Sequence, residues 1–548
     1  MNRKWFLPIL ALAAFLIFLI LCPLAEVGIK ALIINDALDF SYAAETLMEE
    51  QNAVMIRNSL ILGVLVVIVS TCISLPLAYL LSRTEWAESK VLDILFLVPF
   101  MTPPYIASMG WILFMQKRGL LGQLIPFFKD GVTPFFTLAG LVMVMSFHIF
   151  PFMVTLLKNA MLRVPESLDE AAAVCGAGFT MRLRKIFLPL VTGNYVIGAL
   201  LVFVKTLSEY GTPYTLGRRI GFDVFTTDIH RYATIAPISF GKAAVLASVL
   251  VTICLFMWFI QNYITMTHSY RLVGGKGTRR VFKTLTHPVK IATGAAMGCL
   301  FALAVGIPYF SVIATSLIKL RGYGLQAGNF TLAHYAELLL EHDKAMDAIL
   351  NSLFLAVTAS TICAILGTLT VFAVKGLGKK WGRPLEAVSL VPEMLPGIVM
   401  VIGLMLFWND IYDVLPLYNT LGILVLTYVV LFLPFTVQYV TSSLTQISSS
   451  LIEAGRVFGG NTFYVFRRIT VPLILRGIAA GWMMTFIISL RELVAPSMIA
   501  PPNTLVISTF ITREFEQGSV SLGMAMAVLC ILITAGCLLV LNRGIKRF

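Results

Sequence analysis

Long apolar segments alternate with short polar loops along the whole chain. Each segment is long enough to cross a bilayer as a helix, which takes about 20 residues. Lipid offers no hydrogen-bond partner to the backbone, so such segments must be helical. The pattern predicts an all-α polytopic membrane protein with about twelve transmembrane helices, near residues 6–23, 55–82, 92–115, 134–157, 186–207, 241–266, 290–318, 349–375, 385–408, 420–441, 470–490 and 520–542.

Composition agrees with this pattern, because 58% of the residues are hydrophobic and 13% are charged. A soluble protein of any class is far less apolar. The formal net charge of +13 does not indicate nucleic-acid binding, since the basic residues concentrate in short loops between spans. The eight cysteines fall singly, without C-x-x-C or metal-ligand spacing. We therefore expect no disulfide, no metal site and no cofactor in this chain.

Loop charges predict the orientation in the membrane. Residues 24–54 carry six acidic side chains against one lysine, whereas residues 267–290 carry six basic side chains and no acidic one. The basic side is expected to be cytoplasmic. Counting spans then places both termini in the cytoplasm. The first apolar run is longer than the core of a signal peptide and is followed by no A-x-A site, so we expect it to be retained.

The chain repeats itself. Asn58-Ser59-Leu60 matches Asn351-Ser352-Leu353 at an offset of 293, and beyond a longer outer loop Pro151-Phe152 matches Pro434-Phe435 at an offset of 283. Each copy holds an even number of spans, so two parallel tandem repeats are predicted. We assign residues 1–266 to the first repeat, 267–289 to a basic cytoplasmic linker, and 290–548 to the second repeat.

One polar loop occurs in both repeats. The first copy, near residues 160–185, contains Glu170-Ala171-Ala172, then Gly176, and closes on Ile186-Phe187-Leu188-Pro189. Its charges cannot lie in hydrocarbon, so the loop borders the membrane in water. Glu and Ala favour helix and Gly176 permits a change of direction, which predicts two short helices joined there. The second copy, near residues 443–468, has Glu453-Ala454-Gly455 and then Gly459.

This pattern resembles the EAA loop in the permease subunits of ABC importers. The resemblance implies the type I ABC importer permease fold in a bacterial cytoplasmic (inner) membrane. It also implies two copies of an ABC ATPase on the cytoplasmic side and an extracytoplasmic solute-binding protein. The implied ATPase-coupling residues are Glu170, Ala171, Ala172, Gly176, Glu453, Ala454, Gly455 and Gly459. Gly455 departs from the pattern and lowers helix propensity in the second copy.

Ionisable residues that border the spans are candidates for a pathway or gate. They are Lys205 and Glu209 at the outer end of the fifth span, and Arg491 and Glu492 at the equivalent place in the eleventh. In the resembled family this segment borders the translocation pathway. The alternative is a structural ion pair, either Lys205 with Glu209 or Arg491 with Glu209.

Four further positions carry expectations. Asp410 and Asp413 fall in a short outer loop, where we expect them to be solvated. Pro103 and Pro396 occupy matching places near the middle of the third and ninth spans, which predicts a kink in each.

We predict a transport subunit and not an enzyme. The sequence has no G-x-x-x-x-G-K-[ST] phosphate loop, so ATP hydrolysis is expected on separate ATPase subunits. A twelve-helix secondary transporter is an alternative, although it would need carboxylates near the membrane midplane, which the spans nearly lack. A membrane scaffold without transport would need neither the repeat nor the paired loops.

The predicted substrate rests on resemblance alone. The fused arrangement and the Asn329-Phe330-Thr331-Leu332 stretch resemble the ferric iron (iron(III)) transport permease family. Relatives of that family carry 2-aminoethylphosphonate, thiamine, polyamine or sulfate, and these stay alternatives to iron(III).

Overall fold

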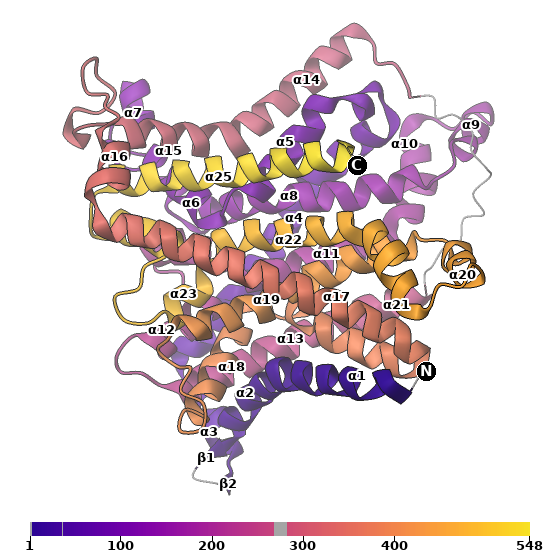
Figure 1. The fold of residues 1–548 in the computed structure, drawn as a ribbon. Coiled ribbons are helices and arrows are strands. Elements are labelled where there is room, and N and C mark those ends of the chain that lie inside the picture. The colour runs from indigo at the N-terminus through magenta and orange to yellow at the C-terminus, as the bar shows by residue number, and fades with distance from the viewer. Residues whose placement is uncertain (1–2, 35–36, 268–281, 548) are drawn as a thin grey trace. The chain divides into compact units, whose positions relative to one another are not determined.

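The computed structural model describes residues 3–34, 37–267 and 282–547. Helices make up most of this part of the chain (Figure 1), and the strands found in it, β1 (Ile33–Ile34) and β2 (Ala37–Leu38), form one antiparallel pair. Most of the predicted linker, residues 268–281, lies outside the described residues. Ten helices of the described part are long and apolar enough to cross a membrane, and a bent pair raises the number to 11.

The helices of the first repeat are α1 (Arg3–Leu16), α2 (Cys22–Leu32), α3 (Phe40–Met48), α4 (Glu50–Arg83), α5 (Lys90–Met101), α6 (Pro104–Met115), α7 (Leu120–Leu124), α8 (Leu138–Leu162), α9 (Glu166–Val174), α10 (Phe179–Arg182), α11 (Leu188–Ser208), α12 (Phe225–Thr234) and α13 (Phe240–Thr267).

The helices of the second repeat are α14 (His287–Phe301), α15 (Ile307–Leu317), α16 (Ala333–Ala336), α17 (Asp343–Met394), α18 (Gly397–Asp410), α19 (Leu421–Thr445), α20 (Ser449–Val457), α21 (Thr462–Val465), α22 (Val471–Leu490), α23 (Val494–Ile499), α24 (Ile507–Glu516) and α25 (Val520–Arg547). Equivalent helices match in length, because α8 and α19 have 25 residues each, and α9 and α20 have nine.

Two of the twelve predicted spans are broken helices, which explains the lower count. Pro103 and Pro396 both adopt extended backbone, with ψ of 134° and 131°, where a continuous helix would need negative ψ. Proline lacks the N–H that would extend the preceding helix and restricts the residue before it. The expected kinks are therefore interruptions, and Lys380–Met394 meets Gly397–Asp410 at an angle of 107°.

Contacts divide the chain into two compact units whose limits differ from those of the repeats. Unit 1 comprises Met1–Glu49, Ile229–Val251 and Phe330–Phe548, and unit 2 comprises Glu50–Asp228 and Thr252–Asn329. Each unit thus contains the first span of one repeat and most of the other repeat. The repeats have exchanged their first spans.

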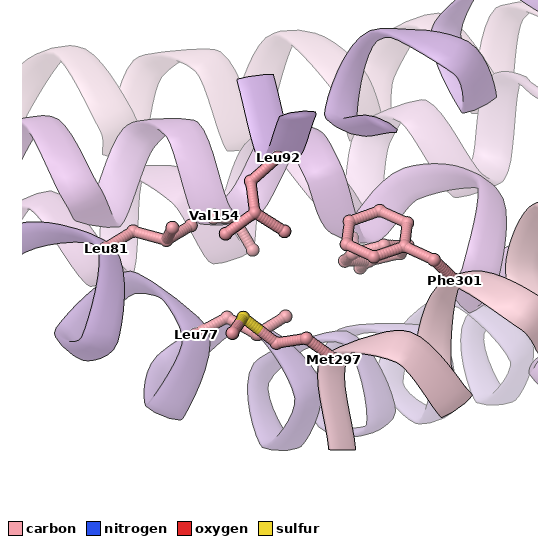
Figure 2. Close-up of a cluster of buried hydrophobic side chains, with 7 residues drawn as sticks. Leu77, Leu81, Leu92, Val154, Met297 and Phe301 are labelled. Carbon is pink, nitrogen blue, oxygen red and sulfur yellow. The ribbon is translucent and has the colours of Figure 1, made fainter. Parts of the chain in front are cut away.

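Unit 2 shows the exchange in its core. Met297 and Phe301 on α14, from the second repeat, are buried against Leu77 and Leu81 of α4 and Val154 of α8 (Figure 2). The same cluster includes Leu92 of α5 and Phe150 of α8. Full burial of one such side chain is worth about 1.5–3 kcal/mol relative to water, and lipid tails reduce that gain, so close packing must supply much of the contact energy.

A glycine receives the exchanged span in each unit. A Cβ atom on Gly110 of α6 would lie 2.7 Å from the carbonyl oxygen of Pro308 on α15. A Cβ atom on Gly403 of α18 would lie 2.5 Å from the carbonyl oxygen of Pro23 on α2. The atoms in the way belong to backbone, which cannot move aside as a flexible side chain would. Glycine is therefore needed at both positions for close approach.

An ion pair adds to the contact in unit 1. The Nζ atom of Lys30, at the end of α2, lies 2.8 Å from Oδ2 of Asp410, at the end of α18. Asp410 is exposed, as expected, but it also has an ion-pair partner that the sequence did not indicate, because Lys30 is 380 residues away and brought close by the exchange. Both side chains are more than a third exposed, so the pair contributes at most about 1 kcal/mol.

A substitution at the glycine contact tests the exchange. We expect Gly403→Leu to lower the thermal midpoint and membrane abundance, since overpacking of this kind costs about 1–3 kcal/mol. Gly28→Leu is the matched control. Gly28 lies on α2, the helix that Gly403 contacts, but a Cβ atom there would meet nothing within 4 Å. The measurement is thermal unfolding of both purified variants by size-exclusion chromatography. Equal midpoints would contradict the contact.

Candidate functional site

The first polar loop consists of two helices joined by a turn, as the sequence predicts. Helix α9 (Glu166–Val174) carries Glu170 and Ala171 on an exposed surface, and α10 (Phe179–Arg182) follows. Gly176 lies between them with a φ of +80°. Residues other than glycine rarely adopt this backbone conformation. The positive φ, and not a lack of space, is therefore the reason for glycine here, because a Cβ atom would meet nothing within 4 Å.

Two hydrogen bonds close the end of α9. The N–H of Ala177 donates to the carbonyl of Ala172 at 2.9 Å, and the N–H of Gly176 donates to the carbonyl of Ala173 at 3.0 Å. This is the Schellman arrangement, which satisfies carbonyls that the helix itself leaves without partners. Ala172 therefore contributes to the helix end through its backbone carbonyl.

The second loop has the same geometry 283 residues later. In α20 (Ser449–Val457), the N–H of Gly460 donates to Gly455 and the N–H of Gly459 donates to Arg456, both at 3.0 Å. The φ of Gly459 is +84°. Two copies with one hydrogen-bond pattern confirm that the loops are equivalent structures.

Gly455 has a packing reason that the sequence did not reveal. A Cβ atom at this position would lie 2.4 Å from Cδ1 of Ile469 and 3.2 Å from Cγ2 of Val465. The glycine lets α20 pack closely on the segment that follows. Treating Gly455 as only a loss of helix propensity was therefore incomplete, and α20 is as long as α9.

Exposed apolar side chains cover both loops, and the sequence interpretation missed them. Val174 is 89% exposed and its equivalent Val457 is 84% exposed. Leu168 and its equivalent Leu451 are also exposed, as is Phe458 at 90%. The signal was available, because the valine and leucine positions recur at the offset of 283, whereas Phe458 replaces Cys175. Exposed apolar groups in water that recur in two places indicate a surface for a partner.

Each loop continues directly into a membrane span. Residues Thr180–Ser208 form one continuous helical span, as do Phe466–Leu490. Both contain one π-helical segment at the loop end, η5 (Leu183–Phe187) and η11 (Phe466–Thr470). No residue outside a helix separates either π-helical segment from the membrane helix that follows it.

The candidate gate carboxylates act as helix caps. Glu209 follows α11, and its carboxylate accepts hydrogen bonds from the N–H of Thr212 at 3.0 and 3.2 Å. Glu492 follows α22, and its Oε1 accepts from the N–H of Val494 at 2.9 Å and of Ala495 at 3.3 Å. Each carboxylate holds the start of the next helical segment, a role that we did not predict.

The basic members of the candidate gate lie beside these caps. The Nζ atom of Lys205 lies 5.4 Å from the ring centroid of Phe152, and Arg491 follows the last residue of α22. The hydrogen bonds of Glu209 are a structural contact, although a different one from the ion pair that we considered. A role for Lys205, Glu209, Arg491 and Glu492 in a gate stays a prediction.

The left-handed turn can be tested directly. We expect Gly176→Ala to destabilise the end of α9 by about 1–2 kcal/mol, because Cβ clashes with the backbone at this φ. Gly178→Ala is the control, since a Cβ atom there would also meet nothing within 4 Å and no positive φ is needed. Hydrogen exchange of the Ala177 amide should become faster in the first variant alone. Equal exchange in both would contradict a turn that depends on φ.

Comparison with known proteins agrees with this arrangement. A family model described as "Binding-protein-dependent transport system inner membrane component" matches residues 70–266 and 361–548. The ferric transport system permease protein FbpB of Actinobacillus pleuropneumoniae is 24% identical over 87% of this chain and 69% of its own length. The Fe(3+)-transport system permease protein FbpB 2 of Haemophilus influenzae is 22% identical over 95% of each chain.

Another relative is shorter. The putative 2-aminoethylphosphonate transport system permease protein PhnV of Salmonella typhi is 27% identical over 47% of this chain and 96% of its own length. The family model matches once in each predicted repeat and covers well over half of the residues. The chain belongs to the inner membrane components of binding-protein-dependent transport systems, and is a permease of the ABC importer class with two family domains in one polypeptide.

Proposed function

We propose that this chain supplies both halves of the membrane pathway of an importer for iron(III), which an extracytoplasmic binding protein delivers. The substrate proposal rests on how much of the chain its relatives match. Ferric transport permeases match 87% and 95% of the chain, across both repeats. The PhnV relative is a single-repeat protein in this comparison, since 96% of it matches 47% of the chain. Fusion of two repeats therefore favours iron(III).

The paired loops are the proposed docking sites for two ATPase subunits. Each offers an exposed glutamate, Glu170 or Glu453, beside exposed apolar groups such as Val174 and Val457. An apolar patch with a charged rim is typical of a protein interface. ATP binding would move the loops, and the continuous helices Thr180–Ser208 and Phe466–Leu490 would carry that movement into the membrane.

Orientation follows from the same proposal. The loops face the cytoplasm where ATP is available, so both termini are cytoplasmic and residues 37–49 face the binding protein. The charge difference between residues 24–54 and 267–290 supports this placement.

The transport of 2-aminoethylphosphonate is the second candidate, favoured by the PhnV relative. Uptake of ⁵⁵Fe(III) and of labelled 2-aminoethylphosphonate can be compared in proteoliposomes that contain the ATPase and the cognate binding protein. ATP-dependent accumulation of iron alone is the expected result. Accumulation of the phosphonate alone would reject iron(III) and leave the importer intact.

The coupling glutamates provide a test of the docking sites. We expect Glu170→Lys and Glu453→Lys to lower ATP-dependent uptake at least tenfold with membrane abundance near wild type, because each places a cation where a partner contacts a carboxylate. Glu341→Lys is the charge-matched control, at an exposed position at the other end of the spans. Full uptake by the double variant would show that the loops are ordinary surface.

Thiol labelling tests the orientation. In a background that lacks the other seven of the eight cysteines, the exposed Cys175 should react with an impermeant thiol reagent in inside-out vesicles stripped of peripheral proteins, and not in intact cells. In a cysteine-free background, Met48→Cys, at a position 81% exposed, should show the opposite behaviour. The reverse pattern for both would invert the topology.

A further inference from the structure

An arginine ties the first loop to its unit. Arg83, the last residue of α4, is buried, and its Nη2 donates to the carbonyl of Met161 at 3.1 Å and of Val164 at 2.8 Å. Its guanidinium lies 4.9 Å from the ring centroid of Phe187. Met161 lies in the last turn of α8, and Val164 lies between α8 and α9, two residues before α9 begins. The side chain thereby satisfies carbonyls at a helix end and fixes the path into the loop.

The second repeat lacks this arginine and has a cavity at the matching helix end. The position equivalent to Arg83, at the offset of 293, is Gly376. The positions equivalent to Met161 and Val164 are Leu444 and Ile447, and both line a cavity of about 380 Å³ within unit 1. The backbone turn is the same, because the N–H of Ile447 donates to the carbonyl of Leu444 at 3.3 Å, as Val164 does to Met161 at 3.2 Å.

The lining of the cavity combines both charges with apolar walls. Lys375 and Glu386 are among the lining residues, together with Val371, Val374 and Val437. The volume falls in the range of small-ligand pockets, about 300–1,000 Å³. A cation and an anion in the lining of a cavity with apolar walls suit a zwitterion that carries apolar chains.

The position of the cavity matches the membrane interface. Its walls come from the ends of two membrane spans, Asp343–Gly378 and Leu421–Thr445. Headgroups of the bilayer lie at this level, and lysines there extend toward phosphates.

We propose that this cavity binds the headgroup of phosphatidylethanolamine. The lipid ammonium takes the place of the Arg83 guanidinium and donates hydrogen bonds to the Glu386 carboxylate and the Leu444 carbonyl. The lipid phosphate pairs with Lys375, and the valines contact the glycerol and acyl chains. The orientation in the proposed function places this lipid in the cytoplasmic leaflet. No other part of this inference rests on the proposed function.

Such a lipid would do in unit 1 what Arg83 does in unit 2. Ile447 lies two residues before α20, just as Val164 lies two residues before α9. A bound headgroup therefore holds the entry to the second loop, and its stiffness depends on the surrounding lipid. The first loop carries its own fixed cation and has no such dependence.

Native mass spectrometry of the full chain tests the proposal, with an equimolar mixture of phosphatidylethanolamine and phosphatidylcholine. The two lipids differ in that the trimethylated headgroup of phosphatidylcholine has no N–H donor. We expect the first retained lipid to be phosphatidylethanolamine, by about tenfold, and Glu386→Gln to abolish this preference. Asp413→Asn, at an exposed position outside the cavity, is the charge-matched control and should keep it.

A second variant restores an arginine at the position next to Lys375 of the cavity lining. Gly376→Arg should remove lipid retention and leave the thermal midpoint unchanged or higher, because its guanidinium can make the bonds of Arg83. The nearest atom to a Cβ at this position is Cδ1 of Ile9 at 3.6 Å, which is an ordinary contact. Hydrogen exchange of residues 449–457 should slow with phosphatidylethanolamine in the wild type and be slow without it in this variant.

Three outcomes overturn the inference. They are equal retention of both lipids, an unchanged preference in Glu386→Gln, and Glu386-dependent binding of L-argininamide that phosphatidylethanolamine does not displace. The last result would assign the cavity to a soluble cation. Lipid retention is measured on the chain alone, so absence of an associated ATPase would reject the proposed function without affecting this result.

Discussion

The close backbone contact between a glycine and an exchanged span is the constraint on which the rest of the structure depends. At Gly110 and Gly403 the space for a Cβ atom is already filled by the backbone of Pro308 and Pro23. Lipid tails remove most of the hydrophobic gain from helix association, so such close packing must hold the spans together. Because each contact joins the two repeats, neither repeat has its complete set of neighbours alone. Fusion in one chain supplies both exchanged spans at a fixed ratio.

This constraint gives the loops a rigid support. α4 packs on α8 and α17 packs on α19, and α8 and α19 each lead into a polar loop. The loops turn at Gly176 and Gly459 and re-enter the membrane as continuous helices. A force on an exposed residue such as Val174 therefore acts between two packed helices.

Local features were predictable from the sequence, and long-range contacts were not. The apolar periodicity and the offset of 283 led to the helices, the paired loops and the turn at Gly176, since all of these depend on residues close in sequence. The contact of Gly403 with Pro23 joins residues 380 apart, and the sequence gives no sign that the first spans are exchanged. The same holds for Gly455, where glycine is needed because the side chain of Ile469 fills the space of a Cβ atom.

Differences between the repeats are as informative as their likeness. Both halves lie in one polypeptide, so each can differ from the other in sequence. The hydrogen-bonded turn before the loop is present in both units, whereas the buried cation of Arg83 is replaced by Gly376 beside a cavity. A helix end with exposed carbonyls favours a nearby cation, and the membrane interface offers one in its amine headgroups. A fixed internal cation in one half and a lipid cation in the other would make the second loop the half whose stiffness responds to the membrane.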